Sequence, residues 1–165
     1  MYVYAKGEGE NTIVLLLGLG AAVPALDFEP LLNELAKNNR VVVVELFGYG
    51  WSDVTNKERT VENIVEEIRL ALKEAGIKGP YILMPHSISG IYSAYYANKY
   101  PYEVKAFIGI DAALPKVTEY FNESVPTLPK ILKYIAPNGI ARLMIYINSE
   151  DFLPIAKEKL IPKKI

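Results

Sequence analysis

The chain has 165 residues, of which 51% are apolar, a formal net charge of −1 and no cysteine. Such a length and composition favour one globular domain with a sizeable core. Balanced charge without a basic run argues against nucleic acid as a partner. The lack of cysteine excludes disulfides and thiolate metal sites. No stretch approaches the roughly 20 apolar residues of a membrane span, so we expect a soluble, cytoplasmic chain, although composition alone does not fix the compartment.

Four apolar, β-branched runs predict strands. They lie at residues 13–17, 41–46, 81–84 and 104–110. None alternates between apolar and polar residues, which is typical of strands buried on both faces of a parallel sheet.

Helical periodicities separate these runs, at residues 31–36, 61–72 and 89–100. Asp27 is the predicted cap of the first helix. Thr60 is the predicted cap of the second helix, and Gly76 ends it. Pro101 stops the third helix. Strand–helix alternation of this kind predicts a doubly wound, mostly parallel α/β sheet.

The regular pattern ends after Asp111. We therefore expect a core over residues 1–114 and a partial cap or irregular helical segment over residues 115–165. Within that segment, residues 140–147 are apolar and could form a helix or a strand; we favour the helix.

The predicted strand at 81–84 breaks abruptly into His86-Ser87-Ile88-Ser89-Gly90. A buried strand that turns sharply into a helix is the layout of a nucleophile elbow, so Ser87 is a candidate nucleophile. The Gly18-Leu19-Gly20 loop could let the N–H groups of Leu19 and Ile88 bind an oxyanion. Taken alone, that loop is better explained as a glycine-rich turn.

Two other polar segments are best explained structurally. The loop at 48–53 is predicted to be a turn, with Trp51 packed at the rim of the site. His86, the single histidine, is adjacent to Ser87, and adjacent side chains in a strand or sharp turn point apart. A packing role is therefore favoured over catalysis, and a lone imidazole without thiols is a poor metal site.

The chain resembles the α/β-hydrolase superfamily in the order and spacing of four segments. These are the Gly-Leu-Gly loop at 18–20, the Gly-Tyr-Gly-Trp-Ser-Asp loop at 48–53, the elbow at 86–90 and the Phe-Ile-Gly-Ile-Asp segment at 107–111. The likeness runs from about residue 2 to 115 and is greatest to an esterase-like branch of low-GC Gram-positive bacteria. It implies a serine hydrolase of small ester-like substrates that needs no cofactor. It also implies Ser87 as nucleophile and Leu19 and Ile88 as oxyanion donors.

The resemblance does not decide which residue is the catalytic acid. Asp111 closes the last clear strand, where a minority of the superfamily places its acid, although an anchoring role in the loop is favoured. Asp151 becomes the candidate if residues 140–147 form a strand instead.

The chain also departs from the pattern of the superfamily. Pro85 stands where the elbow usually has glycine, and Leu17 where many relatives have histidine. Members are usually far longer and carry their catalytic histidine on later strands, and some carry an upstream membrane anchor. We therefore expect a sheet that lacks its last strands and activity that is impaired. A non-catalytic binding or scaffold protein and a fragment that needs a partner chain are the alternatives. The run at 104–110 would then be an exposed edge through which copies could associate.

Overall fold

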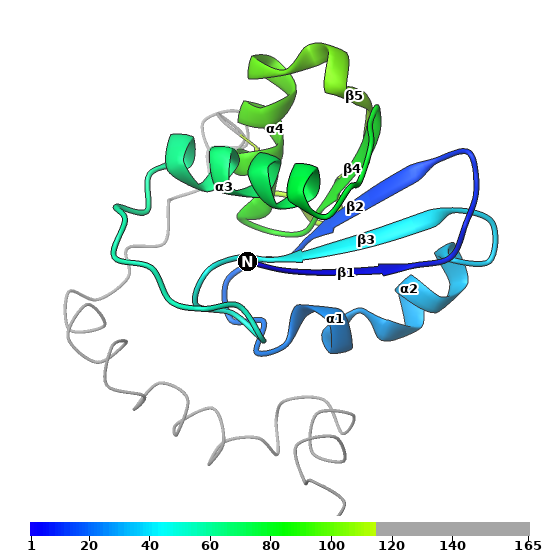
Figure 1. Ribbon diagram of the computed structural model, residues 1–165, viewed down its shortest axis with the longest axis horizontal. Helices are drawn as coiled ribbons and strands as arrows, with labels where there is room; N and C mark the ends of the chain where they lie inside the picture. The colour runs from blue at the N-terminus through cyan, green and yellow to red at the C-terminus, as the bar shows by residue number, and fades with distance from the viewer. Residues whose placement is uncertain (115–165) are drawn as a thin grey trace, which may run out of the picture. The chain divides into compact units, whose positions relative to one another are not determined.

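A five-stranded sheet forms the centre of the protein in the computed structural model, which describes residues 1–114 (Figure 1). The strands stand in the order β1-β3-β2-β4-β5. Strands β2 to β5 run parallel, and β1 pairs antiparallel with β3. Their bounds are β1 Tyr2–Lys6, β2 Thr12–Leu16, β3 Arg40–Glu45, β4 Tyr81–Pro85 and β5 Val104–Phe107. The expected mostly parallel α/β sheet is confirmed.

Helices cover both faces of this sheet. They are α1 (Pro24–Asp27), α2 (Glu29–Leu35), α3 (Val61–Glu74) and α4 (Ser89–Lys99), followed by the 3₁₀ helix η1 (Pro101–Glu103). In Figure 1, α3 and α4 lie on one side of the sheet and α1 and α2 on the other. This is the doubly wound arrangement, in which the loops at the carboxyl ends of the strands meet at one edge.

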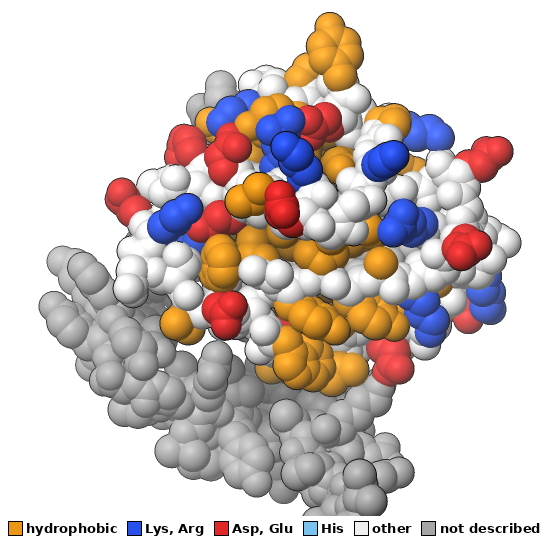
Figure 2. All heavy atoms as spheres, viewed as in Figure 1, with side chains coloured by type: hydrophobic (Ala, Val, Ile, Leu, Met, Phe, Trp, Pro, Cys, Tyr) orange, Lys and Arg blue, Asp and Glu red, His pale blue; other side chains and the backbone are white. Residues whose placement is uncertain are grey.

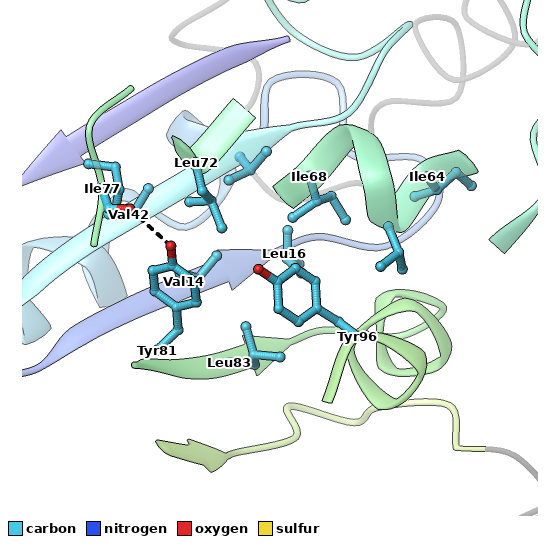
Figure 3. Packing of buried hydrophobic residues seen from close by; sticks show 12 residues of the cluster. Val14, Leu16, Val42, Ile64, Ile68, Leu72, Ile77, Tyr81, Leu83 and Tyr96 are labelled. Carbon is cyan, nitrogen blue, oxygen red and sulfur yellow. Dashed lines mark hydrogen bonds between the residues drawn. The ribbon is translucent and has the colours of Figure 1, made fainter. Parts of the chain in front are cut away.

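The two faces of each central strand contribute to different cores. In β2, Val14 and Leu16 pack in the cluster with α3 and α4, whereas Ile13 and Leu15 pack in the cluster with α2. Figure 3 shows the first cluster, in which the hydroxyl of Tyr81 donates a hydrogen bond of 2.9 Å to the Ile77 carbonyl. Each fully buried aliphatic side chain contributes about 1.5–3 kcal/mol. Burial on both faces explains why these strands have continuous apolar sequences.

The ends of α3 follow the prediction. The Thr60 hydroxyl accepts a hydrogen bond of 3.2 Å from the Asn63 N–H, as a helix cap does. Gly76 follows the helix with a φ of +67°, a conformation that glycine adopts at little cost.

The prediction that Asp27 caps the next helix is wrong. Asp27 is the last residue of α1, and Phe28 separates the two helices, with a φ of −106° and a ψ of 15°. The carbonyl of Phe28 accepts the first hydrogen bond of α2, from the Leu32 N–H at 2.8 Å. The backbone break at Phe28 therefore places Asp27 one residue too early to cap α2.

The segment at 104–110 is an edge of the described sheet, as expected. β5 itself ends at Phe107, but Ile108 and Ile110 go on donating hydrogen bonds to carbonyls of β4, at 2.9 and 2.8 Å. The expectations for residues 115–165, including the helix at 140–147, lie outside the described residues. Within residues 1–114, no helix is both long enough and apolar enough to cross a membrane.

Candidate active site

The turn between β4 and α4 holds Ser87 in a strained conformation. Its φ is +52°, a region that costs a non-glycine residue about 1–2 kcal/mol. Three hydrogen bonds keep it there. The Ser87 N–H donates to the Ile110 carbonyl at 3.4 Å, and the Ser87 carbonyl accepts from the N–H groups of Gly90 and Ala113, both at 2.9 Å. A serine raised on a strained strand-to-helix turn is the geometry of a nucleophile elbow.

The glycine loop after β2 lies directly against this serine. A β-carbon built on Gly18 would lie 2.6 Å from the Ser87 β-carbon and 3.1 Å from its hydroxyl oxygen. The elbow is also tied to β2, because the buried Ser89 hydroxyl donates a hydrogen bond of 2.5 Å to the Leu17 carbonyl. Only glycine therefore lets the backbone at position 18 come this close to Ser87.

The two N–H groups expected to bind an oxyanion are available for a ligand. Within residues 1–114, neither the Leu19 N–H nor the Ile88 N–H donates a hydrogen bond. Leu19 and Ile88 line the same pocket, and the side chain of Leu19 is exposed. Free backbone donors beside a serine are what stabilisation of an oxyanion requires.

This pocket of about 350 Å³ lies over the carboxyl ends of β2 and β3. Ser87 itself does not line it, but Gly18 and Ile88, which flank the serine, do. The other lining residues are Leu17, Leu19, Leu46, Phe47, Gly48, Tyr49, Val54, Thr55, Arg59, Ile64 and Tyr92. The lining is mainly apolar with a few polar groups, as in small-molecule sites.

His86 makes packing contacts. Its backbone N–H donates a hydrogen bond of 2.8 Å to the Leu16 carbonyl. The centroid of its ring lies 5.5 Å from that of the Phe28 ring, and the two ring planes are inclined at 54°. Its Nδ1 faces Gly18, 3.3 Å from where a β-carbon would stand. No hydrogen bond joins the imidazole to the Ser87 hydroxyl within residues 1–114. The imidazole is therefore not hydrogen-bonded to the serine that it would have to deprotonate.

Asp111 stands at the carboxyl end of the edge segment. It is exposed, its φ is +45°, and its side chain bonds to neither Ser87 nor His86. Its neighbours Ile110 and Ala113 are the ones that hold the elbow. The other candidate acid, Asp151, lies outside the described residues.

Sequence reasoning missed a buried carboxylate that shapes the site. Glu45, at the end of β3, has no exposed surface and accepts hydrogen bonds from the N–H groups of Trp51 at 2.7 Å and Ala25 at 3.3 Å. A β-carbon on Gly50 would lie 2.1 Å from its Oε2, so the loop closes tightly over this carboxylate. The available signal was a charged residue inside the apolar run at 41–46.

The loop at 48–53 is a hydrogen-bonded turn, as predicted. The Ser52 hydroxyl donates to the Glu45 carbonyl at 2.5 Å and accepts from the Tyr2 N–H at 2.7 Å. Trp51, however, is not among the residues that line the pocket. Its exposed ring packs 5.8 Å from the ring of Tyr2, on β1. The loop thus positions Tyr49, rather than Trp51, at the site.

Comparison with known proteins identifies relatives of this arrangement. Residues 11–137 match the family model described as the alpha/beta hydrolase fold. The uncharacterized protein YbdG of Bacillus subtilis is 46% identical over 116 residues, which are 70% of this chain and 36% of that protein. An uncharacterized protein of Schizosaccharomyces pombe is 31% identical over 125 residues, covering 71% of this chain and 23% of that protein. The chain thus spans about a third or less of these two relatives.

Solved structures share the fold at low sequence identity. A meta-cleavage product hydrolase from Pseudomonas fluorescens has a TM-score of 0.62 and 20% identity, covering 67% of this chain and 41% of that one. A lipase-like protein from Acinetobacter baumannii has a TM-score of 0.60 and 22% identity, covering 82% and 50%. At such identities the likeness establishes the fold alone.

Proposed function

Because this chain belongs to the α/β-hydrolase fold family, we propose that it is a serine hydrolase that acts on ester-like carbonyl compounds. The observation that carries the proposal is the position of Ser87. It combines a strained backbone, close packing on Gly18 and two nearby N–H groups that have no acceptor among residues 1–114. Strain of this kind persists at functional sites, where the surrounding structure maintains it.

The reaction would be acyl transfer. The Ser87 oxygen attacks the carbonyl carbon, the bond to the alcohol oxygen breaks, and the alcohol leaves with the serine's proton. Water then attacks the acyl-serine, releasing the carboxylic acid and restoring the hydroxyl. The N–H groups of Leu19 and Ile88 donate to the oxyanion in both steps, and one such donor is worth about 3 kcal/mol.

Activity of this chain alone should be low. The single histidine packs on Phe28 and does not bond to Ser87. Asp111 is a candidate acid, but within residues 1–114 no hydrogen bond joins its carboxylate to an imidazole. Without a base the hydroxyl keeps its proton and attacks slowly. Binding of the oxyanion alone can still raise the rate roughly a thousandfold above that of the uncatalysed reaction in water.

The contacts of His86 also favour a second candidate function. A mainly apolar pocket beside a serine without a base suits a binding or scaffold protein that holds a small ligand without turning it over. The two functions differ in one property, which is the reactivity of the Ser87 hydroxyl.

Labelling with a fluorophosphonate, followed by mass spectrometry, tests this property. We expect slow modification of Ser87 that is absent in Ser87→Ala. Ser93→Ala serves as the control, because Ser93 lies on α4 and its buried hydroxyl has no hydrogen-bond partner in the described structure. Adding free imidazole should increase hydrolysis of 4-nitrophenyl acetate more in the parent protein than in Ser87→Ala. No labelling and no rescue would favour the binding function.

A further inference from the structure

One charged side chain lines the pocket. Among the described residues around it, Arg59 alone carries a formal charge, on a wall that is otherwise mainly apolar. The face of the molecule in Figure 2 has acidic and basic side chains interspersed around hydrophobic ones, with no extended basic area. Arg59 is thus the one fixed charge among the described lining residues.

A buried carboxylate holds Arg59 in place. One guanidinium nitrogen of Arg59 donates a hydrogen bond of 2.6 Å to Oε2 of Glu67, on α3. The Glu67 side chain is only 7% exposed, whereas that of Arg59 is 35% exposed. Glu67 therefore anchors the guanidinium from the interior, and the exposed part of the pair is the cation.

Among the residues that the structure describes, Arg59 uses little of its hydrogen-bonding capacity. A guanidinium has five N–H donors, and within residues 1–114 only the bond to Glu67 is made. The planar fork suits two parallel hydrogen bonds to a carboxylate, and such bonds are stronger than those between neutral groups. A guanidinium already fixed in its orientation also loses less entropy on binding.

Two phenols line the pocket with this guanidinium. Tyr49, from the loop after β3, and Tyr92, from α4, are both lining residues. Burial raises the pKa of each phenol, and the positive charge of Arg59 partly opposes that rise. Both hydroxyls thus stay protonated at neutral pH and can donate to an anion.

We propose that the pocket binds substrates bearing a carboxylate remote from the reacting carbonyl, which Arg59 recognises with help from Tyr49 and Tyr92. This proposal names a substrate class for the proposed hydrolase, and it rests on that function for the carbonyl that reacts with Ser87. The pocket volume of about 350 Å³ is near the lower end of the range for ligand sites, which favours short acyl chains. The substrate class is then the monoesters of small dicarboxylic acids.

Binding measured by calorimetry in Ser87→Ala tests this recognition without requiring catalysis. The probes are N-phenylsuccinamate, which has a carboxylate, and N-phenylsuccinamide, its neutral counterpart; both are amides that avoid turnover. We expect the succinamate to bind about ten- to a hundred-fold more tightly, as suits hydrogen bonds to a charged group. Adding Arg59→Gln should remove this preference.

Arg40→Gln is the matched control, because Arg40 begins β3, at the end of the strand that is opposite to the pocket. It should leave the preference unchanged, and thermal unfolding checks that each variant is folded. Equal affinity for the two probes, a preference that survives Arg59→Gln, or no binding of either probe would overturn the proposal. Carboxylate recognition without Ser87 labelling in the parent protein would instead overturn the hydrolase function alone.

Discussion

Gly18 lies so close to Ser87 that a β-carbon at position 18 would stand 2.6 Å from the serine's own β-carbon. Gly18→Ala must therefore shift the loop or the elbow. A displacement of about 1 Å in a reacting group can cost on the order of 10²-fold in rate. We expect the labelling of Ser87 by a fluorophosphonate to slow by about that factor.

Gly76→Ala controls for loss of stability in that experiment. Gly76 also has a positive φ, of +67°, but no atom within 4 Å of an added β-carbon, and it follows α3. It should lower stability while leaving the labelling rate unchanged. Equal labelling of Gly18→Ala and the parent would show that the serine does not depend on this contact.

The strain at Ser87 predicts a gain in stability when the serine is removed. Glycine adopts a φ of +52° without the penalty of about 1–2 kcal/mol that serine has, but loses about 0.5–1 kcal/mol more on folding through its greater freedom. Ser87→Gly should therefore raise the free energy of unfolding by roughly 0.5–1 kcal/mol and abolish labelling. Urea denaturation measures the first effect. A loss of stability would mean that the serine side chain stabilises the turn.

Removal of the Glu45 carboxylate should destabilise the protein. Glu45→Ala leaves the partly buried N–H groups of Trp51 and Ala25 without their acceptor, at a cost of about 1–3 kcal/mol. Trp51 is the only tryptophan, so its fluorescence reports on the loop during urea unfolding. Glu34→Ala is the control, because the 70%-exposed Glu34 side chain pairs with Lys37 at the surface. A similar loss in both variants would contradict the anchoring role of Glu45.

The contact between α3 and η1 predicts sensitivity to acid. The hydrogen bonds from Arg69 lower the pKa of Glu103 below its ordinary value of 4.5, with a further contribution from the Tyr96 hydroxyl. The stabilisation that this brings is complete above pH 4.5 and is lost as the pH falls towards the lower pKa of the folded state. Glu103→Gln should flatten the fall in melting temperature below pH 4.5. An unchanged acid profile would argue against this coupling.

The main elements and the elbow could be predicted because their signals are local. The cap at Thr60 and the buried strands follow from residues that are near one another in the sequence. The prediction that Asp27 caps a helix was wrong because the break at Phe28 depends on how α1 and α2 pack on the sheet. No short sequence pattern encodes this packing.

The pocket could not be predicted in the same way. Glu67, on the helix that follows Arg59, accepts its hydrogen bond, and Glu45 accepts from one N–H group in α1 and one in the loop after β3. Glu67 has ordinary surroundings in the sequence, and Glu45 stands out only as a charged residue inside an apolar run, so tertiary packing alone supplies the partners of both carboxylates. The catalytic roles of Ser87, Leu19, Ile88 and Asp111 stay predictions.

The conformation of the elbow depends on residues that follow β5, because the Ser87 N–H donates to the Ile110 carbonyl and the Ala113 N–H donates to the Ser87 carbonyl. The strained φ of the serine persists only while surrounding contacts enforce it, and two of its three hydrogen bonds come from residues that follow β5. In a nascent chain that contains β4 and α4 but not yet residues 110–113, we therefore expect this turn to relax to an unstrained conformation. We therefore expect Ser87 to reach its strained conformation only after the edge segment at 104–110 and the residues that follow it have docked on β4.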